Sequence, residues 1–173
     1  ADVDCSRVWL AQALIGQALA DNADDAEAAK LDEAEQLLQA ANDSQKSNLG
    51  AEHPDTLYSQ RELAFLQLNK GHFARAEAEF TVVHDVMTIK LGVDHPNTRV
   101  AAMGLALAML RLGKFDEAKP IIIRVSELNR AHLLRQHPDL ELPTSDDLGA
   151  WEECSDEFQY TFGLSHRATQ WAR

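Results

Sequence analysis

The sequence has few of the residues and none of the motifs from which most catalytic and metal sites are built. Only two of its 173 residues are cysteine, Cys5 and Cys154, and they stand too far apart for the clustered ligand pairs of a structural zinc site. It contains no Gly-x-Ser-x-Gly, no phosphate-binding glycine loop and no dinucleotide-binding fingerprint. We therefore expect no enzyme activity, no cofactor and no metal ion.

Basic residues are also in short supply. The 16 Lys and Arg residues stand against 28 Asp and Glu, which gives a formal net charge of −12. Such a surface repels nucleic-acid phosphates and anionic lipids. An apolar run of about 18 residues, the length that spans a bilayer, is missing as well. The composition therefore predicts no nucleic-acid partner and no membrane insertion by this segment.

The two cysteines leave the cellular compartment open. Cys5 and Cys154 could form one disulfide in an oxidising compartment, or they could be two separate thiols. A bridge would place the protein in a periplasm or outside the cell, whereas free thiols favour the cytoplasm. The chain begins at Ala1 without a methionine, which suggests a cut segment or a mature product of a longer precursor.

Proline and aromatic residues are sparse, with five prolines and 6% aromatic residues, and Ala, Leu, Glu, Gln, Lys and Arg dominate. These residues have high helix propensity, so we expect an all-α protein. Residues 8–20 predict a first helix, with Leu10, Leu14 and Ala18 at helical spacing, and residues 31–38 belong to a second helix.

A repeat of 42 residues runs through the sequence. The motif Leu-Gly-x-x-His-Pro-x-Thr at residues 49–56 returns at 91–98, and His137-Pro138 stands a further 42 residues on. Other pairs with this spacing are Leu63 and Leu105, Ala64 and Ala106, Gly71 and Gly113, Phe73 and Phe115, Ala76 and Ala118, and Phe80 and Ile122. A period of this length indicates a stack of similar helical units.

Each unit predicts a helix, a tight turn and a second helix. Gly71 and Gly113 stand where the first helix must end in a left-handed conformation. Pro54 and Pro96 mark helix starts, which we expect to be capped by Asp55, Thr56, Asn97 or Thr98. We expect the small residues Ala64, Ala76, Ala106 and Ala118 at close helix contacts, and Phe73, Phe80, Phe115 and Ile122 in the gaps between hairpins.

These motifs resemble the kinesin-light-chain type of tetratricopeptide repeat. The resemblance implies a right-handed superhelical stack of antiparallel helix hairpins with a C-terminal capping helix. We expect one domain over residues 1–173, with repeats at about 6–48, 54–90 and 96–135 and a cap at 140–173. Trp151, Phe158 and Trp171 are the expected plugs of the exposed end.

The resemblance also implies a function, because this family shares protein or peptide binding on its concave face. The repeat register places six residues towards that groove: Tyr58, Arg61, Phe65, Val100, Met103 and Leu107. A partly apolar groove on an acidic protein suits a partner helix or peptide of apolar or basic character. Where the family carries paired asparagines, this chain has Arg61-Glu62 and Met103-Gly104, so an asparagine ladder is not expected.

Other interpretations stay open. His53, His95 and His137 fall on the repeat marker, where capping or turn packing is expected rather than metal ligation. Glu33, Glu35, Glu77 and Glu79 predict a solvated helix face rather than catalytic carboxylates. The array could instead be the sensory or regulatory domain of a larger bacterial signalling protein, outside the cytoplasm if the cysteines are bridged. The exposed end of so short a stack could also pair with a second copy.

Overall fold

The structure of the protein is a computed structural model, and it describes residues 2–20 and 24–136. The chain divides into two compact units, residues 1–122 and 123–173. The predicted cap at 140–173, with Cys154 and the three aromatic plugs, lies outside the described residues, as does His137.

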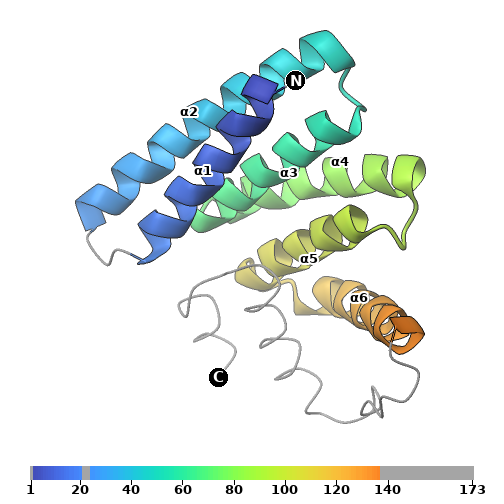
Figure 1. The fold of residues 1–173 in the computed structure, drawn as a ribbon. Coiled ribbons are helices and arrows are strands. Elements are labelled where there is room, and N and C mark those ends of the chain that lie inside the picture. The colour runs from blue at the N-terminus through green and yellow to red at the C-terminus, as the bar shows by residue number, and fades with distance from the viewer. Residues whose placement is uncertain (1, 21–23, 137–173) are drawn as a thin grey trace. The chain divides into compact units, whose positions relative to one another are not determined.

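Every regular element of the described chain is a helix, as Figure 1 shows. The helices are α1 (Asp2–Ala20), α2 (Asp24–Leu49), α3 (Pro54–Asn69), α4 (Phe73–Leu91), α5 (Pro96–Arg111) and α6 (Phe115–Gln136). The predicted all-α class is thus confirmed. The helix α1 begins six residues before the predicted start at Val8.

Helices that follow one another along the chain pack together from α1 to α5. The helix α3 also packs against α1 and against α5, so the first helices of successive hairpins lie beside one another (Figure 1). This alternation puts α1, α3 and α5 on one side of the first unit. A side chain on this side can therefore reach the neighbouring repeat.

The repeat marker forms the helix starts. Pro54 and Pro96 occupy the first turn of α3 and α5, and the residue before each proline is the N-cap. His53 Nδ1 accepts a hydrogen bond from the Asp55 N–H at 3.2 Å, and His95 does the same for Asn97. The expected capping role of these histidines is confirmed. The prediction that Asp, Asn or Thr would cap was wrong, because proline at the first helical position moves the cap to the histidine before it.

Glycines end the helices in the left-handed region. Gly71 and Gly113 have φ of 78° and 77°, which confirms the predicted turns inside the hairpins. Gly50 and Gly92, at 94° and 91°, end α2 and α4 in the same way. Residues with a Cβ rarely adopt such angles, so these glycines set where each helix stops.

The core lies between hairpins and is built around small residues. The predicted alanines at 64, 76, 106 and 118 are all buried, and Phe80 is fully buried in the same cluster as Ala64 and Ala76. In α1 the buried side follows Val8, Ala11 and Ala18, and Leu10 is 51% exposed.

The expectation that Phe115 lies in a gap between hairpins was wrong, because this residue is 65% exposed at the start of α6. Its repeat equivalent Phe73 is half-buried and lies under the guanidinium of Arg111, 4.4 Å from the ring centroid. That guanidinium comes from the end of α5, in the following repeat. The repeat position alone therefore does not bury an aromatic ring. A residue of the next repeat also has to cover it.

Candidate functional site

A chain of hydrogen bonds runs across α1, α3 and α5. Gln12 Nε2 of α1 donates to Tyr58 Oη at 2.8 Å and to Glu62 Oε2 at 3.0 Å. Arg61 donates to Glu62 Oε1 at 2.7 and 3.1 Å and to Asn97 Oδ1 of α5 at 3.0 Å. We call the surface around this chain, on these three helices, the inner face. Its polar groups tie three successive hairpins together.

Arg61 is the centre of this arrangement. Its side chain is buried, with 5% of the residue exposed, and its guanidinium lies 4.5 Å from the centroid of the Tyr58 ring. Glu62 is 9% exposed, so the pair is a largely desolvated salt bridge with additional hydrogen bonds. Burying such a pair costs free energy, and each ion compensates the charge of the other.

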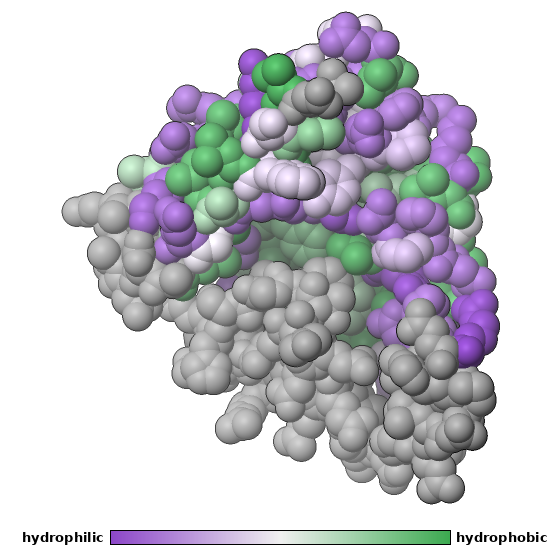
Figure 2. Space-filling model, viewed as in Figure 1, coloured by the Kyte–Doolittle hydropathy of each residue, from purple (hydrophilic) through white to green (hydrophobic). Residues whose placement is uncertain are grey.

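The six residues predicted for the groove fall into two groups. Arg61 and Met103 are buried. The half-buried residues on α3 and α5 are Tyr58, Phe65, Val100 and Leu107. Figure 2 shows a recess with apolar surface in the region where α3 and α5 lie in Figure 1. The inner face therefore presents partly exposed apolar side chains beside a satisfied polar chain.

The apolar part of this face rests on a close helix contact. The Phe65 ring meets the buried Phe80 ring edge to face, with centroids 4.7 Å apart. Phe80 in turn lies against the backbone of Gly104, where an added Cβ would overlap the ring. Sequence reasoning noted Gly104 only as a departure from the family pattern. The signal was available, because a glycine inside a helix often marks a close approach.

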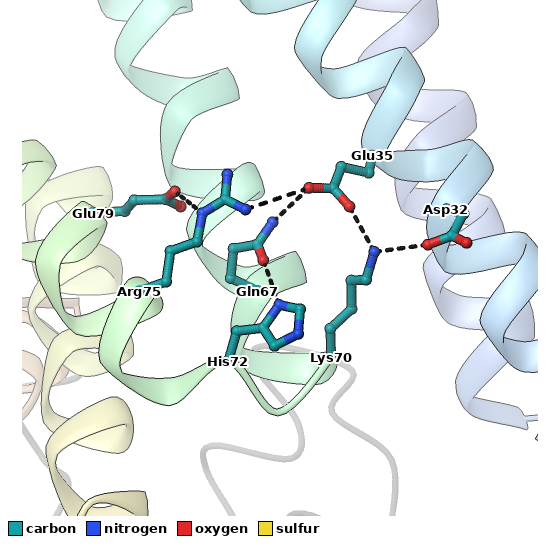
Figure 3. A network of polar contacts seen from close by, with 7 residues as sticks. All are labelled: Asp32, Glu35, Gln67, Lys70, His72, Arg75 and Glu79. Atoms are coloured by element: carbon teal, nitrogen blue, oxygen red, sulfur yellow. Dashed lines mark hydrogen bonds and ion pairs between the residues drawn. The ribbon is translucent and has the colours of Figure 1, made fainter.

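An ion-pair cluster joins the first hairpin to the second at the turn between α3 and α4 (Figure 3). Lys70 Nζ donates to Asp32 Oδ1 at 2.7 Å and to Glu35 Oε2 at 2.6 Å. Gln67 adds a hydrogen bond to Glu35 at 2.8 Å. The hydrogen bond from Lys70 lowers the pKa of Glu35, and those to Asp32 and Glu35 raise the pKa of Lys70.

The next junction uses the same position. Glu77 stands 42 residues after Glu35 and accepts two hydrogen bonds from Lys114, at 2.7 and 2.8 Å. This contact raises the pKa of Lys114. The expectation that Glu35 and Glu77 belong to a plain solvated face was therefore wrong. Each carboxylate pairs with a lysine of the following repeat and thereby links two successive repeats.

Changing Glu35 to glutamine should reduce stability by up to about 1 kcal/mol near neutral pH, because partly exposed pairs contribute little. The pKa of Glu35 is lowered on folding from its ordinary 4.5, so its contribution is present above that value. The contribution is lost as the pH falls through the lowered folded value. Urea unfolding of both proteins between pH 7 and pH 3 should show the difference shrink with acid. A constant difference would contradict this assignment.

We also searched the described residues for a metal site, a membrane-spanning helix and a disulfide. No group of three His, Cys, Asp or Glu side chains in residues 2–20 and 24–136 could hold a metal ion. No described helix is both long and apolar enough to cross a bilayer. Cys5 is exposed on α1, and since Cys154 lies outside the described residues, the disulfide stays a prediction.

Comparison with known proteins points to the same fold. The chain is similar to a Podospora anserina protein described as a kinesin light chain with nearly identical TPR-like repeats: the TM-score is 0.58 and the identity 25%, covering 82% of this chain and 64% of that one. A single-substitution variant of that protein gives a TM-score of 0.57 and 24% identity, covering 82% and 63%. The chain thus spans a little under two thirds of these structures. No family model and no curated protein matches it.

The chain is a tetratricopeptide-like helical repeat protein. The 42-residue motif occurs twice, first along α3 and α4 and then along α5 and the start of α6. The hairpin of α1 and α2 precedes them without a complete motif. Tetratricopeptide-like repeats are stacked so that extended surfaces become available for partners. The fold is therefore that of a general protein-interaction scaffold.

Proposed function

We propose that the inner face binds a polypeptide partner in contact with α3 and α5. The observation that carries this proposal is the set of half-buried apolar side chains on two consecutive repeats, Tyr58 and Phe65 on α3 and Val100 and Leu107 on α5. They lie on a surface whose polar groups are already bonded to one another. An apolar face held this rigidly suits a preformed apolar ligand.

The partner that fits best is an amphipathic helix or an extended peptide with spaced apolar residues. Such segments fill apolar grooves with side chains from one face and keep their polar side in water. Basic residues flanking the apolar ones would be favoured, because the chain carries a net charge of −12. In this proposal the buried Arg61 and Met103 lie beneath the groove and do not contact the partner. Arg61 holds α3 against α5 through its hydrogen bond to Asn97.

A peptide library displayed on phage and selected against the full chain tests the proposal. Val100→Glu and Leu107→Glu should each weaken binding of the selected peptides at least tenfold, because each puts an uncompensated charge into the apolar contact. The matched control is Val82→Glu on the exposed side of α4, where the residue is 62% exposed. Binding is measured by fluorescence anisotropy, and circular dichroism checks that each variant is folded.

The control separates groove binding from charge alone, because all three variants gain the same acidic group. Selected peptides that bind Val100→Glu as tightly as the parent chain would overturn the proposed site. Equal losses for Val82→Glu and Val100→Glu would attribute the effect to net charge and would equally overturn it.

A further inference from the structure

The solvent side of α1 is unlike that of the other helices. Eight residues of α1 between positions 3 and 19 are exposed, and none of them is charged. They are Val3, Cys5, Ser6, Trp9, Leu10, Ala13, Gly16 and Gln17. Val3 and Trp9 are 64% and 73% exposed. We call these eight residues the α1 face.

The lack of charge on this face stands out in a chain of which 25% is charged. The exposed side of α2 carries Asp32, Glu33 and Asp43, and that of α4 carries Asp85 and Lys90. The charged residues of α1 within positions 3–19 are Asp4 and Arg7, which form an ion pair with each other, and the Arg7 side chain is 39% exposed. Asp4 is buried, where it accepts hydrogen bonds from Arg7 at 2.9 Å and from Ser44 of α2 at 2.7 Å.

A leucine-alanine pair occurs in both α1 and α3. It is Leu10-Ala11 in α1 and Leu63-Ala64 in α3, and both alanines are fully buried. In α3 the leucine is buried in the cluster that contains Val8, Leu31 and Leu38 of the preceding hairpin. Leu10, the leucine of the same pair in α1, is instead 51% exposed.

We propose that the α1 face pairs with the α1 face of a second copy, antiparallel across a two-fold axis. Placing the axis between Trp9 and Leu10 sets Val3 opposite Gly16, Ser6 opposite Ala13 and Trp9 opposite Leu10. The small residues Ser6, Ala13 and Gly16 let the two helices approach closely, and the large Trp9 and Leu10 side chains meet next to the axis. Gly16 has open space around it, with nothing within 4 Å of an added Cβ. A two-fold contact needs a self-complementary surface, and this helix provides one.

Electrostatics favour this face over the rest of the surface for contact between copies. Each copy has a net charge of −12, so most surfaces would bring like charges together. The uncharged α1 face avoids close like-charge contacts. Because one helix from each copy makes a small interface, the dimer should be weak, with a Kd in the micromolar range. Exposed tryptophan and leucine are the expected anchors. This inference does not depend on partner binding at the inner face.

Sedimentation equilibrium of the full chain over a wide concentration range tests the dimer. The parent chain should show reversible dimerisation, and Leu10→Glu should raise the Kd at least tenfold. The matched control Val82→Glu, also at an exposed apolar residue, should dimerise as the parent does. A parent chain that is monomeric at all concentrations, or a dimer that Leu10→Glu leaves intact, would overturn the proposal.

Disulfide trapping tests the register. In a background with Cys5→Ser and Cys154→Ser, a mixture of Ser6→Cys and Ala13→Cys chains should form a covalent heterodimer on mild oxidation. Either variant alone should cross-link far less, because positions 6 and 6 of the two copies would lie about 10 Å apart along the helix, beyond disulfide reach. Preferential cross-linking within each variant would refute the antiparallel pairing.

Discussion

Changing Gly104 to alanine should lower the free energy of unfolding by about 2 kcal/mol, because the new methyl group enters a core that is already filled. The Cβ would overlap the ring of Phe80, which is fully buried and held edge to face by Phe65. Alanine normally stabilises a helix interior by about 1 kcal/mol relative to glycine, so the overlap has to outweigh that gain. Chemical denaturation at pH 7 measures the change.

Gly16→Ala is the matched control, because Gly16 is also inside a helix but faces open space. At concentrations where the chain is monomeric, this change should stabilise by up to about 1 kcal/mol. The two substitutions are chemically identical, so their difference reports the contact with Phe80. If both variants are stabilised alike, α5 does not approach Phe80 as closely as the structure indicates.

The second large effect should come from Arg61→Met, with a loss of about 3 kcal/mol, since removing one partner of a buried ion pair leaves the other uncompensated. Among the residues that the structure describes, the one remaining hydrogen-bond donor to the Glu62 carboxylate would be Gln12. Asn97 and the Tyr58 ring would also lose their contacts with the guanidinium. Urea unfolding at neutral pH is the measurement. The loss of stability should lower the urea concentration at which half of the protein is unfolded.

Lys90→Met provides the comparison, because Lys90 pairs with Glu52 at 2.6 Å with both side chains largely in water. That change should cost less than about 1 kcal/mol. Adding Glu62→Gln to Arg61→Met should recover part of the loss, because the stranded charge is removed. Equal effects of Arg61→Met and Lys90→Met would show that Arg61 does not hold a desolvated pair.

Much of the fold could be predicted from the sequence because the repeat contains glycines and prolines at fixed positions, and these residues restrict the backbone conformation to helix ends and helix starts. Glycines at 71 and 113 and prolines at 54 and 96 fix where helices end and begin. The caps were harder, since a histidine ring nitrogen is a less common cap than Asp or Thr. The exposure of Leu10 could not be predicted either, because the motif is incomplete in the first hairpin.

For the candidate site, the sequence predicted which helices contribute residues, but it did not predict which of these side chains are buried. The register placed Arg61 and Met103 on the groove, but burial depends on neighbours that are distant in sequence, such as Asn97 for Arg61. The pairing of Glu35 with Lys70 likewise joins residues 35 positions apart. A charged residue at a repeat position thus gives no sign of whether it faces water or a partner. Only the packed structure supplies that information.

Site-specific photo-crosslinking tests the central claim most directly. A photoreactive phenylalanine analogue placed at Val100 should cross-link a peptide selected against the parent chain, because that residue lies half exposed on α5 of the inner face. The same analogue at Val82 of α4 should not. Cross-linking at position 100 alone is the result we predict. Cross-linking at position 82 alone, or equally at both positions, would contradict binding at the inner face.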